Sequence, residues 1–126
     1  MKIRIGVGIG GTSASTGALT ELASGLDDMG FDSLWLSEVL TGQVFDPVVG
    51  LAWAAASNPR LKIGTTMLLP GRNVLRLAKQ LASLDVLSNG RLLVTLVPGL
   101  TYAPEREAIG LEPKRRGAFI DEALPS

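Results

Sequence analysis

The sequence predicts an α/β protein with a parallel sheet, and three observations lead to that prediction. Short runs of aliphatic and β-branched residues alternate with longer stretches whose apolar residues recur every three or four positions. This is the pattern of strands alternating with amphipathic helices, as in right-handed βαβ units. Glycine, asparagine or proline separates the segments. With 46% apolar residues in a chain of 126, one domain can bury a core of its own.

The expected elements follow one another as strand and helix along the whole chain. Strands are expected over residues 3–9, 32–37, 61–67 and 92–97. Helices are expected over residues 18–29, 47–57 and 74–88, with shorter pieces near 104–108 and 115–124.

Capping residues support the two central helices. Asp46 is a good N-cap and Pro47 suits the first helical position. Asn73 is a second N-cap, and Asn89-Gly90 ends that helix with residues that tolerate a left-handed backbone.

Composition excludes several kinds of chemistry. The chain has no cysteine and no histidine, which excludes thiol catalysis, imidazole acid–base catalysis and cysteine-ligated metals. Twelve basic and twelve acidic residues cancel, so we expect no nucleic-acid binding. No apolar run reaches the roughly 18–20 residues of a membrane-spanning helix, and the start is interpreted as a strand rather than a signal peptide. We therefore expect a cytoplasmic protein with no metal and no membrane contact.

The pattern leaves two architectures open. A doubly wound open sheet is complete at this length, whereas a (β/α)8 barrel needs about 250 residues, so that this chain would form half of one. Residues 117–124 read as a helix that is just beginning, which favours a fragment of a longer fold.

Several residues are candidates for a site, each with a structural alternative. Gly6, Gly8, Gly10 and Gly11 do not match dinucleotide-binding spacing, so they are better explained as space for a ligand or for packing. Glu38 directly follows a buried strand and is either a hydrogen-bond acceptor or base, or an ion-paired structural residue.

Three further segments have the same ambiguity. Residues 65–67, Thr-Thr-Met, would either bind a polar ring edge or fill the sheet. Arg72 would either bind an anion or be solvated. Trp35 and Trp53 are expected in the core rather than as stacking platforms.

The chain also resembles the luciferase-like oxidoreductases over almost its whole length. Residues 30–38, GFDSLWLSE, resemble the second-strand signature of that family. The segments 61–70, 77–80 and 84–92 resemble its third strand, third helix and fourth strand in order, and Glu107–Gly110 with Arg116-Gly117 resembles the segment that follows.

The resemblance implies the N-terminal half, residues 1–126, of a TIM barrel that binds FMN or coenzyme F420 at the carboxyl ends of its strands. The activity it implies is hydride transfer or oxygen activation on a small organic substrate. By position, the residues near the ring would be Gly8, Glu38, Thr66, Met67 and the turn Val97-Pro98-Gly99, with Glu38 as the catalytic candidate.

The chain departs from the family pattern in two places. Many F420-type members have a histidine after the second-strand acid, where this chain has Val39. The turn at residues 97–99 also has less glycine than is common there.

A half-barrel implies a partner. Four strands would leave an unpaired edge and an uncovered apolar face, so we expect a homo-oligomer or pairing with a complementary half-barrel. The alternative to an enzyme is a non-catalytic truncated product or a half-barrel binding and assembly module.

Overall fold

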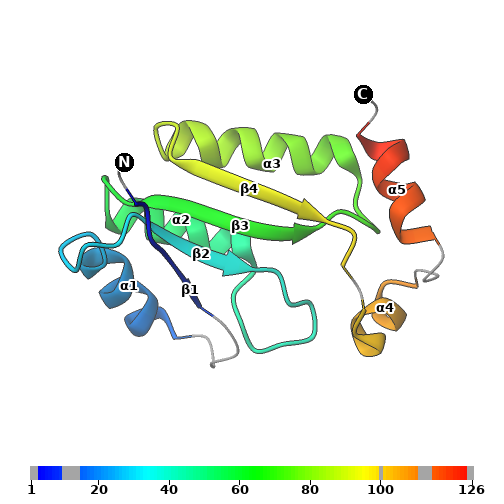
Figure 1. Cartoon of the computed structure of the whole chain (residues 1–126), viewed down its shortest axis with the longest axis horizontal. Helices are drawn as coiled ribbons and strands as arrows, with labels where there is room; N and C mark the ends of the chain where they lie inside the picture. The colour runs from blue at the N-terminus through cyan, green and yellow to red at the C-terminus, as the bar shows by residue number, and fades with distance from the viewer. Residues whose placement is uncertain (1–2, 10–14, 100, 111–114, 125–126) are drawn as a thin grey trace.

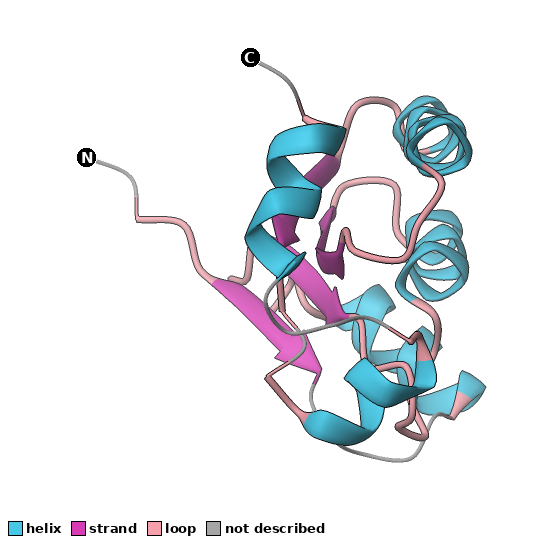
Figure 2. Cartoon of the chain, turned by 90° about the vertical axis from the view of Figure 1, so that its right-hand side faces the viewer, coloured by secondary structure: helices cyan, strands magenta, loops and turns pink. Residues whose placement is uncertain are grey.

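Four parallel strands form a single sheet in the order β1-β2-β3-β4, with the first three helices packed against one side and the last two beyond the carboxyl ends of the strands (Figures 1 and 2). The structure is a computed structural model that describes residues 3–9, 15–99, 101–110 and 115–124. The strands are β1 (Gly6–Ile9), β2 (Ser33–Ser37), β3 (Lys62–Leu68) and β4 (Leu92–Val97). The helices are α1 (Thr16–Gly25), α2 (Pro47–Ser57), α3 (Val74–Leu87), α4 (Ala103–Ala108) and α5 (Arg116–Ala123).

The core lies between the sheet and helices α1 to α3. Every second residue of β2 and β3 points into it, and these residues are at most 6% exposed: Leu34, Leu36, Ile63, Thr65 and Met67. Ile63 and Leu34 belong to a cluster with residues of α1 and α2, whereas Met67 lies in a smaller cluster with Leu77 of α3. The alternate residues of each strand therefore face the other side of the sheet, which the described helices leave largely uncovered (Figure 2).

Capping chemistry sets the helix boundaries as predicted. The Asp46 carboxylate accepts from the amide of Val49 at 3.1 Å, and the Asn73 side chain accepts from the amide of Arg76 at 3.1 Å. Asn89 and Gly90 have φ values of 55° and 75°, the left-handed conformation expected after α3. The ranges of α2 and β4 match the predicted ones.

Three boundaries differ from the prediction in the first unit, and one of them is the end of α1, which lies at Gly25 rather than at Met29. The first strand begins at Gly6 rather than at Ile3, and Ile3 and Ile5 are 73% and 51% exposed. Ladder pairing is confined to residues 6–9, because β2 begins only at Ser33, opposite Gly6. Helix α1 begins earlier than predicted, at Thr16, since the Ser15 hydroxyl accepts from the amide of Ala18 at 3.3 Å.

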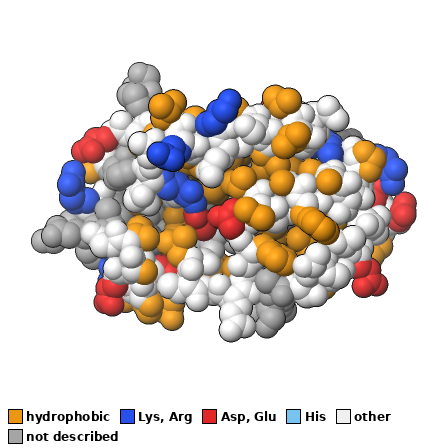
Figure 3. All heavy atoms as spheres, turned by 180° about the vertical axis from the view of Figure 1, so that it is seen from behind, with side chains coloured by type: hydrophobic (Ala, Val, Ile, Leu, Met, Phe, Trp, Pro, Cys, Tyr) orange, Lys and Arg blue, Asp and Glu red, His pale blue; other side chains and the backbone are white. Residues whose placement is uncertain are grey.

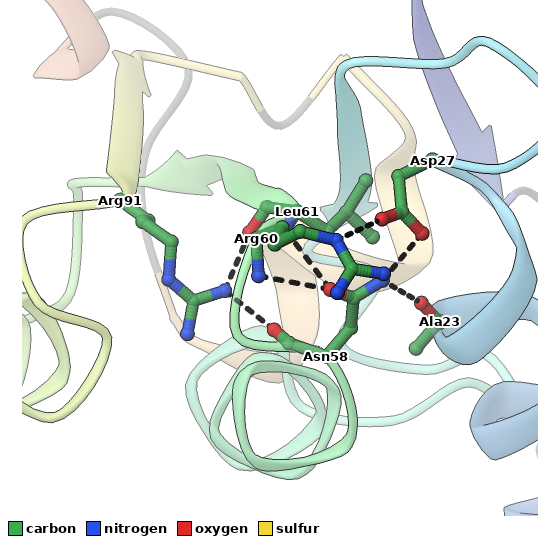
Figure 4. A network of polar contacts seen from close by, with 6 residues as sticks. All are labelled: Ala23, Asp27, Asn58, Arg60, Leu61 and Arg91. Carbon is green, nitrogen blue, oxygen red and sulfur yellow. Dashed lines mark hydrogen bonds and ion pairs between the residues drawn. The ribbon is translucent and has the colours of Figure 1, made fainter.

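Asn58 ties the amino-terminal side of the sheet together (Figure 4). Its buried amide donates to the Ala23 carbonyl at 2.9 Å and to Asp27 at 2.7 Å, and its oxygen accepts from the amides of Arg60 and Leu61. Arg91 then donates to the carbonyls of Asn58 and Leu61, each at 2.6 Å. This network joins α1, α2 and the starts of β3 and β4, at the end opposite the predicted site.

Candidate functional site

The uncovered side of the sheet has a floor made of one indole and two glycines. A Cβ added to Gly64 would lie 2.4 Å from the Trp35 ring, and one added to Gly6 would lie 2.9 Å from its Nε1. Trp35 is thus packed flat across the neighbouring strands, with its Nε1 donating to the Ser33 hydroxyl at 2.9 Å. Gly8 pairs with Trp35 in the ladder, and a Cβ there would meet no atom within 4 Å. The Trp35 ring therefore fills the space at Gly64, whereas the space at Gly8 is open.

A row of hydroxyl side chains lies one step nearer the carboxyl ends of the strands. Ladder pairing places Ser37 of β2 beside Thr66 of β3, and Thr66 beside Thr95 of β4. Each alternates with residues that point into the core, so all three side chains lie on the uncovered side. Thr66 is half-buried, whereas Ser37 and Thr95 are exposed. Only Thr66 of these three was predicted; the other two become visible once the strand register is known.

Glu38 and Arg72 form a buried pair where β2 ends. The Glu38 side chain is 3% exposed and that of Arg72 is 23% exposed, and the Arg72 guanidinium donates to Glu38 Oε1. The other carboxylate oxygen accepts from the amide of Leu68 at 2.8 Å. Burial lowers the pKa of Arg72, but a guanidinium remains charged in proteins. The side chain of Arg72 is therefore bound by Glu38, rather than solvated or free for an external anion.

A hollow of about 320 Å³ lies behind this pair, between the loops that lead into α2 and α3. Glu38 and Arg72 line it together with Asp46 and Ile109. Glu105 of α4 closes the neighbouring loop, because its buried carboxylate accepts from the amide of Leu40 at 2.6 Å. The described part of α4 thus fixes the segment that follows Glu38.

The turn after β4 packs against the end of β3. The amide of Leu69 donates to the Val97 carbonyl at 3.2 Å. Gly99 has a φ of +43°, and a Cβ there would lie 2.1 Å from Leu68 Cδ2. Residues 97–99 and Glu38 therefore meet at Leu68, while Gly8 lies on β1 at the other edge of the sheet.

Three sequence-based expectations place side chains where the structure does not, and one of them is Trp35, which was expected in the core and lies half-buried on the uncovered side. Met67 is fully buried in the cluster with Leu69 and Leu77, so only its backbone is available on the uncovered side. Trp53, expected in the core, is 52% exposed, and its Nε1 donates to the Thr20 hydroxyl at 2.8 Å. Alternation along β2 and β3 and the outward face of α2 account for these positions.

The described residues hold neither a cluster of metal ligands nor a membrane-spanning helix. Within those residues, no group of three or more carboxylates is arranged to hold a metal ion. None of the described helices is both long and apolar enough to cross a bilayer.

Comparison with known proteins identifies the family. The family model for luciferase-like monooxygenases matches residues 1–125. Limonene 1,2-monooxygenase of Rhodococcus erythropolis is 34% identical over 108 residues, which are 82% of this chain and 28% of that protein. The F420-dependent glucose-6-phosphate dehydrogenase of Kineococcus radiotolerans is 27% identical over 97% of this chain and 39% of its own length.

Solved structures show the same fold. The monooxygenase RslO1 of Streptomyces bottropensis superposes with a TM-score of 0.84 at 29% identity, over 97% of this chain and 41% of that one. The FMN complex of the oxygenating constituent of 3,6-diketocamphane monooxygenase from Pseudomonas putida gives 0.84 at 19% identity, over 98% of this chain and 38% of that one. The sheet is thus the TIM-barrel type rather than a doubly wound one, and the chain spans well under half the length of these proteins. On the match over residues 1–125, the chain belongs to the luciferase-like monooxygenase family.

Proposed function

We propose that this chain is the coenzyme-facing N-terminal half of an oxidoreductase that uses FMN or coenzyme F420. The observation that carries the proposal is the uncovered side of the sheet, which has open space at Gly8 on β1 and a row of hydroxyls on β2 to β4, those of Ser37, Thr66 and Thr95. Ligands of parallel α/β barrels bind at the carboxyl ends of the strands, where these hydroxyls lie. The relatives named above include an FMN complex and an F420-dependent dehydrogenase.

The residues present fit a flat, partly polar ring. Trp35 and the glycines on either side of it make a smooth apolar floor, and among the described residues no atom lies within 4 Å of a Cβ at Gly8. Neighbouring strands lie about 4.8 Å apart, so hydroxyls on three of them can bond successive polar atoms along one ring edge. When bound, the coenzyme supplies the hydride or oxygen chemistry, and the protein positions it and excludes water.

The predicted contact residues have different parts in this proposal. Thr66 would bond the ring edge through its hydroxyl, and Met67 would contribute only backbone. The turn Val97-Pro98-Gly99 would border the ring from β4, and Gly8 would provide room for it at β1. Glu38 lies behind this layer.

A titration of the purified chain tests the proposal. Ring fluorescence of FMN, and separately of F420, should change on binding, and Thr66→Val together with Thr95→Val should raise the Kd. The Ser83→Ala variant on α3 is the control, because its hydroxyl bonds only the Lys79 carbonyl of its own helix. No fluorescence change with either coenzyme would contradict coenzyme binding by this half alone.

We also propose that a second half-barrel covers the open side, as a second copy of this chain or as a complementary half. An exposed apolar residue on the open side of β4 favours this assembly: Leu93, which pairs with Gly64 in the ladder, is 38% exposed. A twofold axis along the barrel would place β4 of each copy beside β1 of the other, parallel, and close eight strands without an edge. Association without coenzyme binding would favour an assembly module rather than an enzyme.

A further inference from the structure

We infer that Glu38 and Arg72 are positioning residues that hold the carboxyl end of β3 in place for the ligand, rather than groups that react with it. The inference rests on the proposed function for its ligand, but its geometry stands on the contacts of Leu68 alone. Leu68 is the last residue of β3, and both of its backbone polar groups are held by side chains.

Side chains continue the ladder where β2 stops. The amide of Glu38 donates to the Thr66 carbonyl at 2.9 Å, the last contact that β2 makes with β3 through its backbone. Beyond it, the Glu38 carboxylate accepts from the amide of Leu68 at 2.8 Å, in place of a further strand carbonyl. Arg72 Nε donates to the carbonyl of Leu68 at 2.8 Å. The ion pair between the two side chains closes this ring of contacts.

The pair reaches the proposed ligand surface through Leu68. Thr66, two residues earlier, has its carbonyl bound to the backbone of Glu38, and its hydroxyl lies on the uncovered side. Gly99 packs against the Leu68 side chain and Val97 bonds the next amide. Thr66, Val97 and Gly99 of the proposed site are therefore positioned through Leu68.

The surroundings explain why Glu38 is not free to react. Each carboxylate oxygen already accepts a hydrogen bond, one from a backbone amide and one from a charged donor. Charge-assisted bonds of this kind are stronger than neutral ones. Losing either partner would leave the other charge buried and unpaired. Variants of Glu38 and Arg72 should therefore have matching effects on the Leu68 amide and on coenzyme affinity.

Amide NMR of the whole chain tests the geometry without any ligand. An amide bound to a carboxylate resonates far downfield, so the Leu68 proton should move upfield in Glu38→Gln and in Arg72→Met. Its hydrogen exchange should accelerate about tenfold or more relative to amides elsewhere in β3. The matched control is Arg60→Met, which breaks the ion pair with Asp27 at the opposite end of the sheet and should leave Leu68 unchanged.

Coenzyme affinity then separates positioning from direct contact. Glu38→Gln and Arg72→Met should raise the Kd by similar factors, of about ten, and the double variant should do little more than either alone. Arg72→Lys keeps the charge but loses the bond to the Leu68 carbonyl, so its Kd should lie between those of the wild type and Arg72→Met. This variant also replaces Glu38→Gln in the test if Glu38→Gln does not fold. An unchanged Leu68 amide, or lost binding in Glu38→Gln with normal binding in Arg72→Met, would overturn the inference. If the wild type binds neither coenzyme, the proposed function fails. The NMR measurement on the Leu68 amide still tests this inference in that case.

Discussion

Glycine and tryptophan meet at one point of the sheet where no side chain beyond hydrogen fits. Gly64→Ala would place a methyl group 2.4 Å from the Trp35 ring, so that the ring has to shift. Overpacking of this kind costs about 1–3 kcal/mol. Urea unfolding should show that loss for Gly64→Ala, while Gly8→Ala, where the methyl group meets open space, should change stability by less than about 1 kcal/mol.

Thr65 has a buried hydroxyl without a partner among the described residues. The side chain is fully buried on the helix side of β3, between Ile63 and Met67. Since an unsatisfied buried polar group costs about 1–3 kcal/mol, Thr65→Val should stabilise the protein by about 1 kcal/mol. Thermal unfolding of Thr65→Val and Thr66→Val side by side checks this, because Thr66 points to the open side and its change should be close to zero. A lower Tm for Thr65→Val would show that the hydroxyl is bonded.

These residues also show what alternation along a strand can and cannot predict. The resemblance by position places Thr66 and Met67 together in the site, yet a strand turns neighbours to opposite faces. Which face is covered depends on the helices that follow. Arg72 shows a limit of prediction from local sequence. Its partner is 34 positions away, and no local pattern predicts such a pair.

At the scale of elements, helix caps and turn residues could be predicted well because their chemistry is local. Asp46, Asn73 and Asn89-Gly90 mark boundaries through their own side chains or φ values. The first strand was overextended for the opposite reason. Its length depends on where β2 begins, and an alternating apolar pattern at Ile3 and Ile5 carries no information about that partner.

The Asn58 network makes a prediction about how α1, α2 and β3 hold together. Asn58→Ala would leave the Ala23 carbonyl and the Leu61 amide without this partner, at a site where Asn58 itself is 2% exposed. We expect a loss of roughly 3 kcal/mol in the free energy of unfolding. Denaturant titration measures it, with Ser57→Ala as the neighbouring control, whose hydroxyl bonds only the Trp53 carbonyl of its own helix. Equal stabilities of the two variants would contradict the role given to Asn58.

Asp27 gives the same network a dependence on pH. The hydrogen bond from Arg60, and after it that from Asn58, lowers the pKa of Asp27. A lowered pKa in the folded state contributes stability above the unfolded value of about 3.9 and loses it as pH falls through the folded value. The stability difference between the wild type and Asp27→Asn should therefore be constant from about pH 7 to 5 and shrink below about pH 4. A difference that grew on acidification would contradict this sign.

The whole molecule presents two apolar surfaces, and they predict different assemblies. One is the open side of the sheet, where the proposed site lies. The other is the helix side, where apolar side chains gather in Figure 3; the exposed ones on α2 and α3 are Val49, Trp53, Leu75, Val86 and Leu87. Only pairing through the open side also brings the edge strand β4 of each copy beside β1 of the other.

Substitutions on each surface distinguish the two assemblies. Leu93→Lys puts a charge on the open side, where Leu93 is 38% exposed and pairs with Gly64 in the ladder. A buried unpaired charge is costly, so closure of an eight-stranded barrel should be lost and sedimentation velocity should show a folded monomer. Leu75→Lys on the outer side of α3, where Leu75 is 80% exposed, should sediment like the wild type. Dissociation by Leu75→Lys with an intact Leu93→Lys assembly would place the partner on the helices, and the open side would then remain available to the coenzyme.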